Sequence, residues 1–120
     1  MISYLWLATF TAMLVVGQLL FKHVALAIRG RSPTDGLLAV AQSPTFYAAL
    51  ALYGVATLLW IWILSRVPLS QAYPWVALGT GIVPLLAWLV FNERVGSAYW
   101  IGIVLVMAGV FLTQYASEGP

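Results

Sequence analysis

Gln18 and Lys22 are polar residues next to a long apolar stretch, and they lie four positions apart. Side chains at this spacing share one face of a helix. A lysine at the end of an apolar helix can bind a phosphate as a point charge, and a glutamine one turn deeper can donate a hydrogen bond. The pair is therefore a candidate site for an anionic headgroup. In the alternative, Lys22 only extends towards the lipid headgroups and Gln18 bonds a neighbouring helix.

Glu93 and Tyr73 complete the set of candidate substrate-binding residues. Glu93 is predicted on the same side of the membrane as Lys22. It could accept hydrogen bonds from a sugar hydroxyl or amine, pair with Lys22, or simply favour the positive N-terminus of the next helix. Tyr73 is predicted on the opposite side, where its hydroxyl could contact a headgroup, although a single tyrosine more often belongs to the interfacial aromatic belt.

The acidic residues Asp35, Glu93 and Glu118 all fall in predicted loops or at the terminus. A proton-coupled cation exporter needs a carboxylate at membrane depth, where burial raises its pKa and lets proton and cation compete. The sequence therefore disfavours that mechanism. It also contains no cysteine, metal-ligand cluster, nucleophile triad or phosphate-cradling glycine loop. We expect no enzyme activity, cofactor or metal site, and a net charge of +2 gives no basis for nucleic-acid binding.

Four apolar stretches without Asp, Glu, Lys or Arg must position these residues. Each has the roughly 20 residues that a bilayer-spanning helix needs. A chain that is 63% hydrophobic also has more apolar surface than a soluble domain of 120 residues can bury. The sequence thus predicts an all-α, polytopic membrane protein with a single domain over residues 1–120. We expect transmembrane helices at about 2–28, 45–65, 70–91 and 97–116, and an interfacial segment at about 34–42.

The connections between these helices give two further expectations. Thr34 and Asp35 can cap the interfacial segment, because Pro33 ends any continuation of the first helix. The turn at 67–70 is so short that the second and third helices are expected to be antiparallel neighbours.

The third predicted helix carries Pro74, Gly79, Gly81 and Pro84. Prolines and glycines inside a membrane helix predict a kink and the close approach of another backbone. This helix should therefore pack centrally or line a cavity. Gly79 and Gly81 could form a hinge for alternating access, although close packing alone would also explain them.

The last predicted helix carries small residues that could contact another subunit. Gly102 and Gly109 are seven positions apart and so share a face, and Ala108 flanks the second of them. Membrane helices pack closely through such stripes of small residues. We expect a helix-packing or dimer contact at Gly102, Ala108 and Gly109.

The basic residues predict one fixed orientation in the membrane. The first and third loops share one side and hold Lys22, Arg29, Arg31 and Arg94, whereas the other side holds Arg66. Cytoplasmic loops carry the excess of Lys and Arg. We expect these two loops in the cytoplasm and both termini on the periplasmic or external side.

Several short motifs resemble the drug/metabolite transporter superfamily in its four-helix form. In order along the chain they are Gly17-Gln18-x-x-x-Lys22, Val67-Pro68-Leu69-Ser70-Gln71-Ala72-Tyr73-Pro74, Glu93, Trp100-Ile101-Gly102 and Ala108-Gly109-Val110. The resemblance covers nearly the whole chain. It implies a four-helix bundle like that of the small multidrug resistance proteins.

Two branches of this superfamily differ at one position of the first helix. The small multidrug resistance proteins, which export cationic drugs against protons, carry an essential glutamate three residues before the glycine that matches Gly17. In this chain Leu14 stands at that position. The EamA-like group, which includes the ArnE/ArnF-type subunits thought to flip an undecaprenyl-phosphate-linked aminosugar, also lacks this glutamate. The chain is therefore more similar to the EamA-like group.

The resemblance implies a flippase, or a flippase subunit, for a polyprenyl-phosphate-linked sugar or a similar anionic amphiphile in the bacterial inner membrane. Four helices enclose little, so we expect a homodimer or a heterodimer with a similar four-helix subunit. Two alternatives stay open: a proton-coupled small-molecule or multidrug exporter, and a non-transporting membrane subunit of a glycosyltransferase system.

Overall fold

A computed structural model describes residues 2–117, and all secondary structure in this part of the chain is α-helical. The helices are α1 (Ile2–Ala27), α2 (Pro33–Ala41), α3 (Pro44–Leu64), α4 (Leu69–Ala72), α5 (Pro74–Phe91) and α6 (Ser97–Ser117). Four segments, at 4–27, 44–64, 69–91 and 97–116, are long and apolar enough to cross a membrane. The expected all-α, polytopic membrane fold is therefore confirmed.

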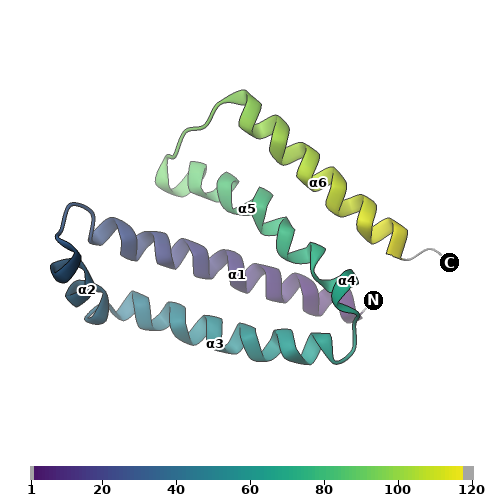
Figure 1. The fold of residues 1–120 in the computed structure, drawn as a ribbon, viewed down its shortest axis with the longest axis horizontal. Coiled ribbons are helices and arrows are strands. Elements are labelled where there is room, and N and C mark those ends of the chain that lie inside the picture. Colours follow the sequence, from purple (N-terminus) through teal and green to yellow (C-terminus); the bar gives the residue numbers. More distant parts are fainter. Residues whose placement is uncertain (1, 118–120) are drawn as a thin grey trace.

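The four long helices lie side by side in one layer, in the order α3, α1, α5, α6 (Figure 1). The molecule accordingly measures 55 × 37 × 20 Å along its principal axes. The prediction that the second and third spans are neighbours was wrong, because α1 lies between α3 and α5. The short α4 carries the chain past the end of α1, and α1 has apolar residues on both sides with which to bury two partners.

The best-buried part of the molecule lies at the end where α1, α3 and α4 meet. Its fully or nearly buried side chains are Leu7, Phe10, Ala56, Ile63, Val67 and Ala72. Small residues let α1 and α3 approach closely, and Phe10 stacks on Trp60 with ring centroids 4.7 Å apart. In a bilayer such packing, and not the hydrophobic effect, holds helices together. The packing of α1 against α3 thus fixes the position of the α1 side chains that face α5.

Serine–proline pairs start two of the helices. The Ser32 hydroxyl accepts a hydrogen bond from the backbone N–H of Asp35 at 3.2 Å, and Ser43 accepts one from Phe46 at 3.3 Å. Proline follows each cap, as the first turn of a helix allows. The expected cap at Thr34 and Asp35 was therefore wrong, because both residues lie inside α2.

The third predicted span is divided at Tyr73 into α4 and α5. Pro74 cannot donate a backbone hydrogen bond, so the chain restarts there as a new helix. Further along, a Cβ on Gly81 would overlap with Met107 of α6, so Gly81 lets these two helices approach. Gly79 has open space around its Cα. The expected close approach is found at Gly81, and the predicted hinge at these glycines stays a prediction.

Candidate functional site

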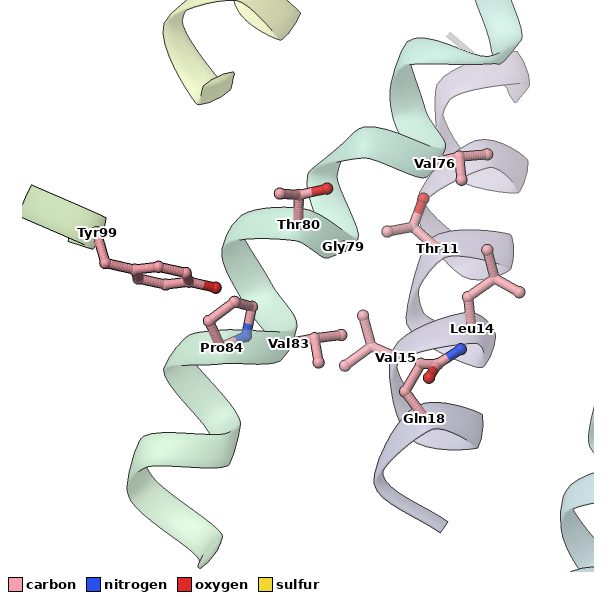
Figure 2. Close-up of a pocket in the computed structure, with 10 residues that line it drawn as sticks. All are labelled: Thr11, Leu14, Val15, Gln18, Val76, Gly79, Thr80, Val83, Pro84 and Tyr99. Carbon is pink, nitrogen blue, oxygen red and sulfur yellow. The ribbon is translucent and has the colours of Figure 1, made fainter. Parts of the chain in front are cut away.

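A groove runs between α1 and α5, with a volume of about 370 Å³, and Tyr99 of α6 reaches its rim (Figure 2). Its lining is mostly apolar, with a few neutral polar groups. The lining residues are Thr11, Leu14, Val15, Gln18, Val76, Gly79, Thr80, Val83, Pro84 and Tyr99. The groove therefore suits a ligand that is neutral along most of its length and forms a few hydrogen bonds.

No acidic side chain is among the residues that line this groove in the described chain. Leu14, which stands where the drug exporters carry their glutamate, is one of the lining residues. The acidic residues of the described part are Asp35, which lies in α2, and Glu93, which follows α5. A carboxylate that binds proton and cation in turn is thus missing from the groove in the part of the chain that the structure describes.

An ion pair lies one helical turn beyond Gln18, towards the C-terminal end of α1. Lys22 Nζ is 2.9 Å from Glu93 Oε2, and the two side chains remain 35% and 44% exposed. Glu93 reaches this place because Asn92 adopts a left-handed conformation (φ 56°) that turns the chain as α5 ends. Asparagine tolerates this conformation better than most residues. The chain therefore brings one positive and one negative group together beside the groove.

Gln18 is held by a residue that sequence analysis missed. Its amide nitrogen donates a hydrogen bond to the hydroxyl of Tyr53 on α3, at 2.7 Å. The Tyr53 ring stacks on Phe21 with centroids 5.0 Å apart, and its edge lies against Gly17, where a Cβ would overlap with the ring. Gln18 thus both lines the groove and bonds a neighbouring helix. A tyrosine in the middle of an apolar span was the signal that could have revealed this partner.

Thr11 and Thr80 contribute polar groups deeper in the groove. The Thr11 hydroxyl lies 3.0 Å from the carbonyl of Leu7 and 3.1 Å from that of Trp75, so it also ties α1 to α5. Proline has no N–H, so Pro84 leaves the carbonyl of Thr80, four positions earlier, without its usual helical donor. The groove therefore offers neutral hydrogen-bonding groups, but no charge, at membrane depth.

The opposite end of α5 is closed by a second polar network. Trp75 Nε1 donates to Gln114 Oε1 at 3.1 Å, and Gln114 Nε2 donates to the carbonyl of Gln71 at 3.0 Å. These bonds join α4, α5 and α6. The charged pair of Lys22 and Glu93 lies at the other end of the groove.

Of the four predicted substrate-binding residues, the structure brings three together. Gln18, Lys22 and Glu93 lie near the C-terminal ends of α1 and α5, whereas Tyr73 lies between α4 and α5. Figure 1 shows α4 at the opposite end of the layer. Tyr73 is 61% exposed, and its ring meets that of Trp60 edge-on at 6.5 Å. Tyr73 is thus not part of the groove.

The predicted subunit contact lies on α6, the outermost helix of the layer (Figure 1). Gly102, Ala108 and Gly109 are all exposed, and no atom lies within 4 Å of a Cβ built on either glycine. These residues are therefore not used for packing within the described chain. The contact with another subunit stays a prediction.

Comparison with known proteins gives a consistent result. Residues 3–115 match the EamA-like transporter family. A relative in Pectobacterium atrosepticum is 38% identical over 93% of this chain and 97% of its own, and one in Pseudomonas savastanoi pv. phaseolicola is 34% identical over 88% and 93%. Both are named "Probable 4-amino-4-deoxy-L-arabinose-phosphoundecaprenol flippase subunit ArnE". No solved structure matches this chain.

Proposed function

The chain belongs to the EamA-like transporter family, and on that premise we propose that it is one subunit of a flippase. Its cargo is a polyprenyl-phosphate-linked aminosugar, which it carries across the bacterial inner membrane. The names of the relatives support this cargo, because they describe flippase subunits for an aminoarabinose joined through phosphate to undecaprenol. The protein moves this lipid without making or breaking a covalent bond.

The observation that carries the proposal is the ion pair of Lys22 and Glu93 beside an uncharged groove. An aminosugar phosphate has one anionic and one cationic group, so it can take over both partners. The phosphate binds Lys22 and the ammonium group binds Glu93. The two side chains are 35% and 44% exposed, so the ion pair contributes only about 0–1 kcal/mol to the stability of the protein. Cargo can therefore replace it at low cost.

The groove provides the path for the neutral part of the headgroup. Its apolar walls and its hydroxyl and amide groups match a sugar, which has both apolar faces and hydrogen-bonding hydroxyls. The polyprenyl tail stays in the hydrocarbon, along the exposed apolar faces of the helices. The charged groups of the cargo need partners at the end of the groove where the headgroup enters, and Lys22 and Glu93 lie at that end.

A second four-helix subunit completes the site. A single layer of helices leaves the groove open to lipid on one side, and transport needs a wall that can close on the cargo. We propose that α6 meets this subunit through Gly102, Ala108 and Gly109, whose surroundings are empty within the described chain. The partner is a copy of this chain or a related subunit.

The positive-inside rule sets the orientation in this proposal. Lys22, Arg29, Arg31 and Arg94 lie towards the end of the layer that holds the ion pair, so this end faces the cytoplasm, and both termini face the periplasm. The site would then bind cargo from the cytoplasmic leaflet. A reporter enzyme that is active only outside the cytoplasm should therefore be active when it is fused to the C-terminus.

Reconstitution tests the proposal directly. Proteoliposomes would hold the purified chain, alone or with a candidate second subunit, and a polyprenyl-phosphate aminopentose confined to one leaflet. A membrane-impermeant amine-reactive reagent on the other side would label the amine once it has crossed. We expect labelling to depend on this chain. Labelling at the rate of empty liposomes in both preparations would overturn the proposal, and proton-driven efflux of a quaternary ammonium compound would favour the exporter.

A further inference from the structure

We infer that Tyr53 is a positioning residue: it orients Gln18 so that the Gln18 carbonyl oxygen accepts hydrogen bonds from the cargo's sugar. This inference deepens the proposed function and rests on it. It starts from the 2.7 Å hydrogen bond between the Gln18 amide nitrogen and the Tyr53 hydroxyl, which joins α1 to α3 on the side away from the groove. Nothing in the resemblance to known transporters points to Tyr53, because it lies outside the motifs that carry that resemblance.

The Tyr53 ring is fixed on two sides. It stacks on Phe21 with an interplanar angle of 13°, and its edge fills the space that a side chain at Gly17 would occupy. A tyrosine held in this way has little freedom to move its hydroxyl. Because Gly17 has no side chain, the Tyr53 ring can lie against α1 at this position, next to Gln18.

The direction of this hydrogen bond, from the Gln18 nitrogen to the Tyr53 hydroxyl, determines which group Gln18 presents to the cargo. A glutamine amide has an N–H₂ end that donates and a carbonyl end that accepts. Because the nitrogen is directed at Tyr53, it is turned away from α5 (Figure 2), and the carbonyl oxygen is the end left for the groove. A carbonyl oxygen binds hydroxyl and ammonium groups, and it does not bind a phosphate.

This arrangement separates the recognition of phosphate from that of sugar. Lys22 attracts the phosphate at the end of the groove, and Gln18, one turn deeper, accepts a hydrogen bond from the sugar. Tyr53 therefore acts through Gln18 and does not touch the cargo. Its effect should appear in the choice between lipids with and without a sugar.

The test is equilibrium binding to the full chain, with its second subunit if one is required, in lipid nanodiscs. Two probes are compared: polyprenyl phosphate and polyprenyl phosphate carrying an aminopentose. Tyr53→Phe keeps the ring but removes the hydroxyl. We expect it to raise the Kd of the aminopentose lipid about fivefold, as the loss of one neutral hydrogen bond does, and to leave the Kd of the bare phosphate unchanged.

A matched control and a double variant keep the test sharp. Tyr47→Phe also removes a hydroxyl from α3, one that donates to the carbonyl of Ala41 at 2.6 Å, and it should change neither Kd. Tyr53→Phe added to Gln18→Ala should have no further effect, because Tyr53 acts through Gln18. Equal weakening of both lipids, unchanged binding, or additive effects would overturn the inference. If the wild-type protein binds neither lipid, the proposed function itself fails, which is a distinct result.

Discussion

Lys22 of α1 and Glu93, two residues after the end of α5, form an ion pair with 2.9 Å between Nζ and Oε2. The pair bridges the two helices that form the groove. It lies in the same half of the membrane as Gln18 and on the same face of α1, one turn apart. The pair and the groove are therefore neighbours and make up one candidate site.

Lys22→Ala should reduce flipping of the aminopentose lipid by at least about tenfold, because it removes a charge-assisted contact with the phosphate. The initial rate of amine labelling in proteoliposomes measures this. Arg29→Ala, which removes a positive charge from the same side but outside the groove, should have a much smaller effect. Equal rates for Lys22→Ala and the wild type would remove Lys22 from the site.

Glu93→Gln should weaken the discrimination between cargoes that differ only in the charge of the amine. The carboxylate is the group that the proposal pairs with the sugar's ammonium, so the variant should lose several-fold in affinity for the aminopentose lipid. It should lose little for the same lipid with its amine acetylated. Competition between the two lipids measures the preference. Asp35→Asn, in α2, is the matched control, and an unchanged preference in Glu93→Gln would show that the ion pair only fastens the loop.

Gly17→Ala should destabilise the α1–α3 pair by about 1–3 kcal/mol, the range for overpacking a well-packed core. A methyl group there meets the Tyr53 ring, which Phe21 holds from the other side. Thermal unfolding in detergent, followed by circular dichroism, gives the change in stability. Gly54→Ala on α3 is the control, because nothing lies near its Cα and alanine favours a helix more than glycine does. Comparable loss in both variants would contradict the close contact.

Gly102→Leu and Gly109→Leu should disrupt assembly but leave the fold of the single chain intact. Both glycines have empty surroundings in the described chain, so a larger side chain can only interfere with a second subunit. Native mass spectrometry gives the oligomeric state. Gly79→Leu would instead intrude into the groove, so it should lower transport without changing the mass of the assembly. Assemblies of wild-type size in both α6 variants would exclude this face as the contact.

The membrane fold could be predicted from the sequence because it depends on length and polarity alone. An apolar segment of about 20 residues must form a helix in a bilayer, where every backbone polar group needs an internal partner. Pro44 likewise marks the start of a helix by local chemistry, whereas we expected a cap at Thr34 and Asp35 in place of the start at Pro33, and one unbroken span in place of the start at Pro74. The predicted role of Gln18 and Lys22 as a pair on one helix face followed from their spacing in the same way.

The order of the helices could not be predicted in this way. The short turn at 67–70 suggested that the spans on either side of it pack together, but α1 lies between them. Tyr73 lies at the end of the layer opposite Lys22, as its place in the chain predicts, but only the packing of the helices leaves it outside the groove. Neither the helix order nor the extent of the groove depends on residues that are close in sequence, so no local pattern contained them.

The sequence alone determined that this chain crosses the membrane four times and that the mid-membrane part of its spans holds no charged side chain, because hydropathy and residue type fix both. Only the tertiary structure decided that Glu93 meets Lys22 and that Tyr53 holds Gln18. These partners come from different helices, and their distances depend on how α1 packs between α3 and α5. Packing of membrane helices is set by the fit of small and large side chains over the whole surface, which no single segment reveals.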